Sequence, residues 1–176
     1  MLLLTARPNT VWNSDLEADG YGEERPVMAG IRATFCTGEL ALTATIAKTL
    51  AQLKAPTNQR LMVDFVSVCF DGVTPTNEPV LVQVMRQTTA GTMSAGTPYP
   101  NDPTIDESLQ STVQYNATVE PTSGAVLLQF DVHPQAGLVF TIPRDQRIVV
   151  QGGGRLGVVC TAPQNVNAIV TLGYEE

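Results

Sequence analysis

The sequence predicts an all-β protein: an antiparallel β-sandwich, jelly-roll-like, with an extended N-terminal arm. Three observations support this fold class. Short apolar runs alternate with polar residues, turn residues separate these runs at intervals of roughly 8–12 residues, and no segment requires a long amphipathic helix. About eight to ten strands are expected in one domain, residues 31–176, and that number suits a sandwich or jelly roll.

Residues 1–30 form the predicted arm. They contain several Pro, Asn and Gly residues and few apolar ones after the opening leucines. Trp12, the single tryptophan, lies in this arm and needs a pocket, either on its own domain or on another subunit. Trp12, Leu16 and Tyr21 are therefore candidate partner-binding residues, together with Tyr99 further along the chain.

The first predicted strands follow directly after the arm. Residues 31–36 are a short β-prone run. Residues 40–53 fit either a helical spacing or an alternating one, and the recurring threonines with Pro56 after them favour strands.

Residues 60–70 predict a central strand, because apolar side chains occupy both of its faces. Strict alternation places Leu61, Val63 and Phe65 on one of these faces. Asp71-Gly72 then signals a turn.

The next strand covers residues 79–87, and a long stretch without periodicity, residues 88–111, follows it. We expect this stretch to be a loop. A loop of this length in a compact domain is usually functional or an interaction element.

The second half of the chain returns to alternation. Gly152-Gly153-Gly154 is expected to form a hairpin between two strands, because glycine readily adopts positive φ. The remaining strands are expected at residues 112–119, 126–132, 138–142, 148–151, 156–161 and 166–174.

Composition excludes several classes of partner. The net charge is −7 and the pI about 4.6, and no stripe of Lys and Arg can be drawn. Such a chain is not expected to bind nucleic acid or an anionic membrane. There is neither a signal-peptide pattern nor a run of about 20 apolar residues, so we expect a soluble protein made in a cytoplasm.

The three cysteines, Cys36, Cys69 and Cys160, each lie in an apolar run. Their odd number and wide spacing give neither a disulfide framework nor a zinc motif. We expect free thiols that are buried as small hydrophobic side chains.

Few residues of the chain are typical of a catalytic site. His133 is the only histidine, it precedes a proline at a strand end, and no Gly-x-Ser-x-Gly motif presents a nucleophile. Asp102, Asp106 and Glu107 match a calcium loop poorly. An enzyme of cupin type would need several histidines, so we expect no enzyme and no catalytic, metal or cofactor-binding residue.

Several motifs resemble small virion structural proteins of tailed bacteriophages. The resemblance covers roughly residues 38–176 and rests on strand and turn residues. The segments that carry it are residues 50–58, Phe70-Asp71-Gly72, residues 86–94, residues 130–135, residues 152–157 and residues 160–163.

The resemblance implies a capsid decoration (cement) protein, a β-sandwich subunit that binds the outside of an assembled capsid and stabilises it. It implies a homotrimer, with the major capsid protein as partner and the virion surface as location. The alternative is a head-fibre or tail module that binds a receptor or carbohydrate. Tyr99 and Tyr115 would then be the stacking platforms.

Overall fold

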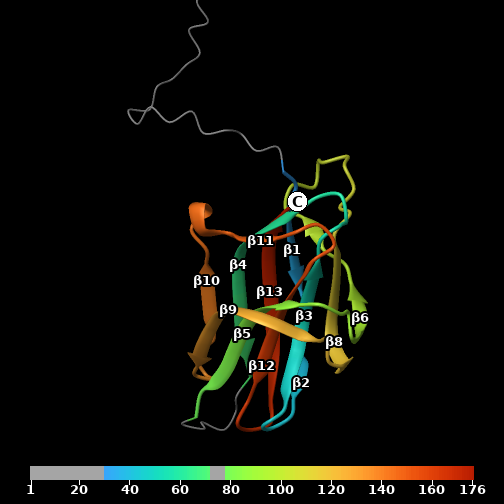
Figure 1. The fold of residues 1–176 in the computed structure, drawn as a ribbon. Coiled ribbons are helices and arrows are strands. Elements are labelled where there is room, and N and C mark those ends of the chain that lie inside the picture. The colour runs from blue at the N-terminus through green and yellow to red at the C-terminus, as the bar shows by residue number, and fades with distance from the viewer. Residues whose placement is uncertain (1–29, 72–77) are drawn as a thin grey trace, which may run out of the picture.

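The computed structural model describes residues 30–71 and 78–176, and the regular elements of this part of the chain are strands apart from one 3-10 turn (Figure 1). Trp12, Leu16 and Tyr21 lie outside the described residues, as does Gly72 of the predicted turn. The elements are β1 (Arg32–Cys36), β2 (Leu40–Leu42), β3 (Ala47–Lys54), β4 (Leu61–Phe70), β5 (Val80–Gln87), β6 (Thr92–Gly96), β7 (Tyr99–Pro100), β8 (Thr112–Val119), β9 (Ser123–Val132), β10 (Leu138–Thr141), the 3-10 turn η1 (Arg144–Gln146), β11 (Ile148–Val150), β12 (Arg155–Thr161) and β13 (Val166–Glu175).

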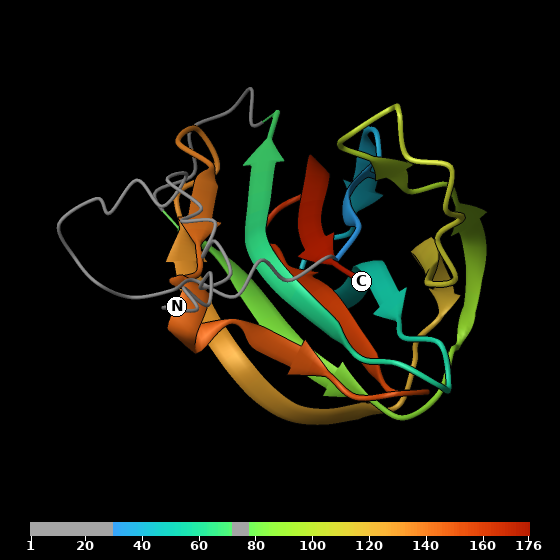
Figure 2. The same ribbon diagram turned by 90° about the horizontal axis from the view of Figure 1, so that it is seen from above.

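These strands form two antiparallel sheets. Sheet A has the order β10-β4-β13-β1-β7, with β11 also pairing with β4 and β2 also pairing with β13. Sheet B has the order β6-β8-β3-β12-β5-β9. Seen from above, the two sheets form two layers that face each other (Figure 2). The predicted all-β sandwich is confirmed.

The strand pairing is nested, with the first strands pairing with the last. β1 and β2 pair with β13, β3 with β12, β4 with β10 and β11, and β5 with β9. One long antiparallel hairpin wound into two layers gives this connectivity, which is that of a jelly roll. The segment from β6 to β8 is inserted between the paired strands β5 and β9, and it adds β6 and β8 to one sheet and β7 to the other.

A β-bulge in β4 decides which residues enter the core. Gly173 pairs with Phe65 and Tyr174 with Val63, so Asp64 has no partner on β13 and the alternation changes phase. Val66 and Val68 therefore join Leu61 and Val63 as fully buried residues between the sheets. The prediction that Phe65 shares a face with Leu61 and Val63 is wrong.

Three further segments test expectations from the sequence. Residues 40–53 are strands, β2 and β3, with a turn at Thr45, whose φ is 65°. The stretch 88–111 is not wholly irregular, because it contains β6 and β7. Gly152-Gly153-Gly154 does not form a hairpin: β11 pairs with β4 in sheet A and β12 with β3 and β5 in sheet B, so these glycines carry the chain between the sheets.

Candidate functional site

The outer face of sheet A carries a continuous area of side chains without charge. Antiparallel pairing aligns Val139, Ser67, Thr171 and Cys36 in one row across the sheet. A second row runs through Thr141, Phe65, Gly173, Thr34 and Tyr99. With the neighbouring pair on β4 and β13, these residues define the uncharged face: Thr34, Cys36, Phe65, Ser67, Cys69, Tyr99, Val139, Thr141, Ile169, Thr171 and Gly173.

Two apolar side chains project from opposite edges of this face. Val139 on β10 is 73% exposed and Tyr99 on β7 is 69% exposed. Between them the residues are mostly small, and the ring of Phe65 lies over Gly173 where a Cβ atom would otherwise be. Ile169 is a further exposed apolar residue near the middle of the sheet. Such residues are suited to contact with another apolar surface.

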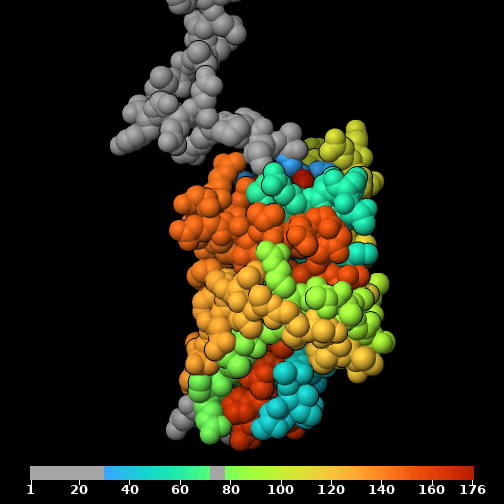
Figure 3. Space-filling view, viewed as in Figure 1, coloured from blue at the N-terminus to red at the C-terminus, as the bar shows by residue number. Residues whose placement is uncertain are grey.

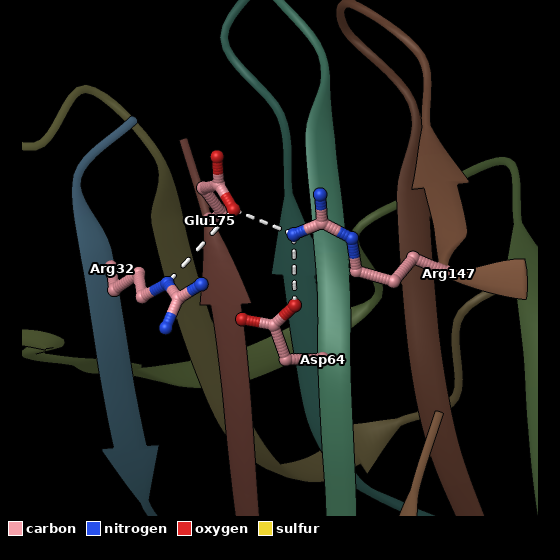
Figure 4. Close-up of polar contacts among 4 residues, drawn as sticks. All are labelled: Arg32, Asp64, Arg147 and Glu175. Atoms are coloured by element: carbon pink, nitrogen blue, oxygen red, sulfur yellow. Dashed lines mark hydrogen bonds and ion pairs between the residues drawn. The ribbon is translucent and has the colours of Figure 1, made fainter. Parts of the chain in front are cut away.

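A cluster of four charged residues borders the uncharged face at one end (Figure 4). The Arg147 Nη1 atom lies 2.6 Å from Glu175 Oε2 and 3.0 Å from Asp64 Oδ1. Arg32 approaches Glu175 more loosely, at 4.0 Å from Nε to Oε2. Two positive and two negative groups meet here, so the formal charge of the cluster is zero.

Interruptions in regular strand pairing place these charged groups. Asp64 is the bulged residue of β4, and Arg147 ends the excursion through η1 that separates β10 from β11. The side chains of Arg147 and Glu175 are only 7% and 5% exposed. The hydrogen bond to Glu175 raises the pKa of Arg147, against the opposing effect of burial. The ion pair fixes both side chains in place, which gives the cluster a structural role.

The outer face of sheet B, unlike that of sheet A, carries charged side chains and is partly covered by other segments of the chain. It presents Lys54, Arg155 and Asp131. The space-filling view shows atoms of several segments of the chain on this side of the molecule (Figure 3). Residues 88–91 and 119–122 pack on each other, with Thr88 N donating to Thr122 O at 3.0 Å. This part of sheet B is therefore already covered by the chain itself.

A buried polar network holds that cover in place. Gln52 Nε2 donates to Gln87 Oε1 at 2.6 Å and to Thr89 O at 3.1 Å. Gln87 Nε2 donates to Thr49 Oγ1 at 3.0 Å, and the Thr49 hydroxyl donates to Glu120 Oε2 at 2.6 Å. Among the described residues, Gln52 Oε1 is a buried oxygen without a partner.

The residues considered for catalysis are not grouped. His133 is exposed, and its Nδ1 atom accepts a hydrogen bond from Gln135 N at 3.2 Å within a turn. The Asp102 carboxylate accepts hydrogen bonds from the hydroxyl and backbone N–H of Thr104, which lower its pKa and close a local turn. Within residues 30–71 and 78–176, no three His, Cys, Asp or Glu side chains are grouped to hold a metal ion.

The cysteine expectation holds for only one residue. Cys160 is buried, and burial raises its pKa to about 12. Cys36 and Cys69 are exposed on the uncharged face, which corrects the prediction that all three are buried. An apolar run predicts that a residue lies in a strand. Which alternate residues of that strand face water depends on how its sheet packs in the fold.

Of the predicted partner-binding residues, Tyr99 alone lies in the described part of the chain, and it is exposed on the uncharged face. Tyr115 is half-buried and packs against Phe35, with 6.1 Å between the ring centroids. Sequence reasoning missed Phe65 and Val139 as surface residues. The signal for Phe65 was the break in alternation between Val63 and Val66.

No helix in the described residues is long and apolar enough to cross a bilayer. Comparisons with protein-family models, with curated proteins and with solved structures found no match to the chain. The resemblance to virion proteins of tailed bacteriophages therefore stays a prediction.

Proposed function

We propose that this chain is a non-enzymatic structural protein of a tailed-phage virion, which binds the outside of the assembled capsid as a decoration (cement) subunit. The observation that carries the proposal is the uncharged face on a rigid jelly roll, bordered by a charge-neutral cluster. A surface of this kind is suited to packing against other proteins. The strand and turn motifs that resemble phage virion proteins supply the choice of partner.

The proposed mechanism is stabilisation by selective binding. A subunit that binds only the assembled lattice lowers the free energy of that lattice relative to its dissociated parts. Residues 1–30 are proposed to reach neighbouring capsid subunits, with Trp12, Leu16 and Tyr21 as anchors. A homotrimer would have a mass of about 56 kDa, three times 18.8 kDa.

Co-sedimentation with capsids tests this function. The chain is expected to sediment with expanded capsids of the phage whose genome encodes it, and to raise their melting temperature. Deletion of residues 1–30 or Trp12→Ala is expected to reduce binding sharply, while Tyr21→Phe serves as the conservative control. Binding that is unchanged by the deletion would contradict the role of the arm, and an absence of binding at micromolar concentration would contradict the decoration role.

A second candidate function is a receptor- or carbohydrate-binding module of a head fibre or tail. The observation that favours it is the row containing Phe65, Thr34 and Tyr99, which presents two aromatic rings on one face. A glycan array with Tyr99→Ala as control separates the two functions. A decoration subunit is expected to bind no glycan, whereas a carbohydrate module should lose its signal in the variant.

A further inference from the structure

We infer that the uncharged face of sheet A is covered by a second copy of this chain. The inference concerns the purified protein and does not depend on the capsid as target. It deepens the proposed function, which rests on the same face, by naming a second copy as the protein that packs there.

Charge favours a second copy as the protein that covers the uncharged face. Each chain carries a net charge of −7, so two copies repel each other through most pairs of surfaces. The uncharged face carries no Asp, Glu, Lys or Arg side chain. The four charged groups at one end of it cancel, and the Glu39 and Asp71 carboxylates lie at the other end, where both accept hydrogen bonds from Asn167. Two identical acidic chains can therefore meet through the middle of this face without placing carboxylates against each other.

Area and composition are the second argument. The strands of sheet A range from two residues in β7 to ten in β4 and β13, so at about 4.8 Å between strands and about 3.4 Å per residue the sheet covers roughly 600 Å². Two copies that meet through it would bury about 1,200 Å² in total, which is the lower limit for a stable interface of standard size. The uncharged face would form the apolar centre of that interface, and the cluster around Arg147 its polar rim.

The shape of the face also suits contact with a second copy. Val139 and Tyr99 project from opposite edges, and the residues between them include Ser67, Thr171 and Gly173. A projecting edge of one copy can therefore lie against the small side chains of another. In a pair the two faces would meet, and in a ring of three each face would meet the neighbouring copy.

Two cysteines of the chain can report whether this surface is covered. Cys36 and Cys69 lie on the uncharged face and are exposed, whereas Cys160 is buried in the core. A second copy packed on the face would shield the first two thiols together. Cys160 would stay unreactive in either state and serves as an internal control.

The test is alkylation with iodoacetamide across a dilution series, read for each cysteine peptide by mass spectrometry, with light scattering to give the mass. Cys36 and Cys69 are expected to react quickly at high dilution, and at least about tenfold more slowly in the associated protein. A chain that stays monomeric at the highest concentration overturns the inference. So does an oligomer in which both thiols react as fast as in the monomer.

Matched substitutions locate the surface independently of the thiols. Val139→Lys places a charge on the uncharged face, and Val126→Lys places one on β9 of sheet B, where the side chain is 46% exposed. The first is expected to raise the dissociation constant at least about tenfold and the second to leave it unchanged. Thr141→Lys on the same face repeats the test, and equal effects of both valine variants overturn the inference.

A variant lacking residues 1–29 tests whether the chain's own N-terminal residues, instead of a second copy, cover the face. If both thiols are protected in the full-length monomer and become reactive on this deletion, the chain's own N-terminal residues cover the face and the second-copy inference fails. If the deletion variant still protects both thiols only on association, the inference stands. Neither result requires capsids, so failure here is distinguishable from failure of the decoration role.

Discussion

Arg147 and Glu175 form a 2.6 Å ion pair in which neither side chain is more than a tenth exposed. The pair joins the excursion between β10 and β11 to the last strand of the jelly roll, and Asp64 completes it from the bulge in β4. Gly30 lies directly against Glu175, and a Cβ atom there would be 2.6 Å from its side chain. Three segments that are far apart in the sequence are thus fixed at one end of sheet A.

Breaking this pair should cost much of the stability of the fold. Arg147→Ala leaves the buried Glu175 carboxylate with only the looser contact to Arg32, and we expect the free energy of unfolding to fall by about 3–5 kcal/mol. Urea unfolding measures the change. Arg144→Ala, in the exposed part of the same excursion, is the matched control and should change stability by less than about 0.5 kcal/mol. A similar small loss in both variants would contradict the structural role of the cluster.

The buried glutamines of sheet B offer a second comparison. Gln87→Leu removes the acceptor of Gln52 and the donor to Thr49, so we expect a loss of about 1–3 kcal/mol. Limited proteolysis should cleave residues 88–91 or 119–122 sooner in this variant. Gln83→Leu, which removes a 2.9 Å glutamine–glutamine hydrogen bond on the exposed side of β5, is the control and should be nearly neutral. Equal losses would show that the cover is held by other contacts.

The contact between Phe65 and Gly173 should be sensitive to a single methyl group. Gly173→Ala places a Cβ atom in the ring of Phe65, and overpacking of this kind costs about 1–3 kcal/mol. Phe65→Ala in the same chain should recover part of that loss, because the ring that clashes is gone. A double-mutant cycle by urea unfolding measures the coupling. Purely additive losses of unfolding free energy would show that the Phe65 ring does not contact Gly173.

Alkaline pH should destabilise the protein through two buried groups. Burial raises the pKa of Cys160 from 9.0 to about 12 and that of Tyr174 from 10.0 to about 12, despite a 2.8 Å hydrogen bond to Ser111. Because the unfolded chain loses these protons first, the stability is complete below pH 9 and falls between pH 9 and about 12.

The measurement is urea unfolding at several values of pH in this window. Wild type should lose on the order of a few kcal/mol across it. Cys160→Ala and Tyr174→Phe should each lose less, because each variant lacks one of the two ionisations. Identical slopes for wild type and both variants would contradict this assignment.

The strands of this protein were predictable because alternation and turn residues are local signals. Residues 40–53 show this, since the threonines that favoured strands over a helix lie in β3 and in the segment between β2 and β3. The same local signals do not determine which layer receives the next strand. Gly153 has the positive φ of 73° expected of a turn glycine, yet the turn leads to the opposite sheet.

The candidate site was less predictable, because it depends on which side of each strand faces water. Cys36 and Cys69 resemble buried thiols in sequence but lie on the outer face of sheet A. Phe65 reaches that face only because of the bulge at Asp64. Tyr99 was found from sequence because an aromatic residue in a long polar stretch is a local signal.

The nested strand order has a mechanical consequence. Ile31 and Glu176 exchange two backbone hydrogen bonds of 2.9 Å, so the first and last described strands begin and end at the same edge of the molecule. Tension applied at these two points would open the β1–β13 ladder one rung at a time, as in unzipping, instead of loading all its rungs at once. Pulling at Ile31 and Glu176 should therefore separate β1 from β13 at low force, because each hydrogen bond of the ladder breaks in turn.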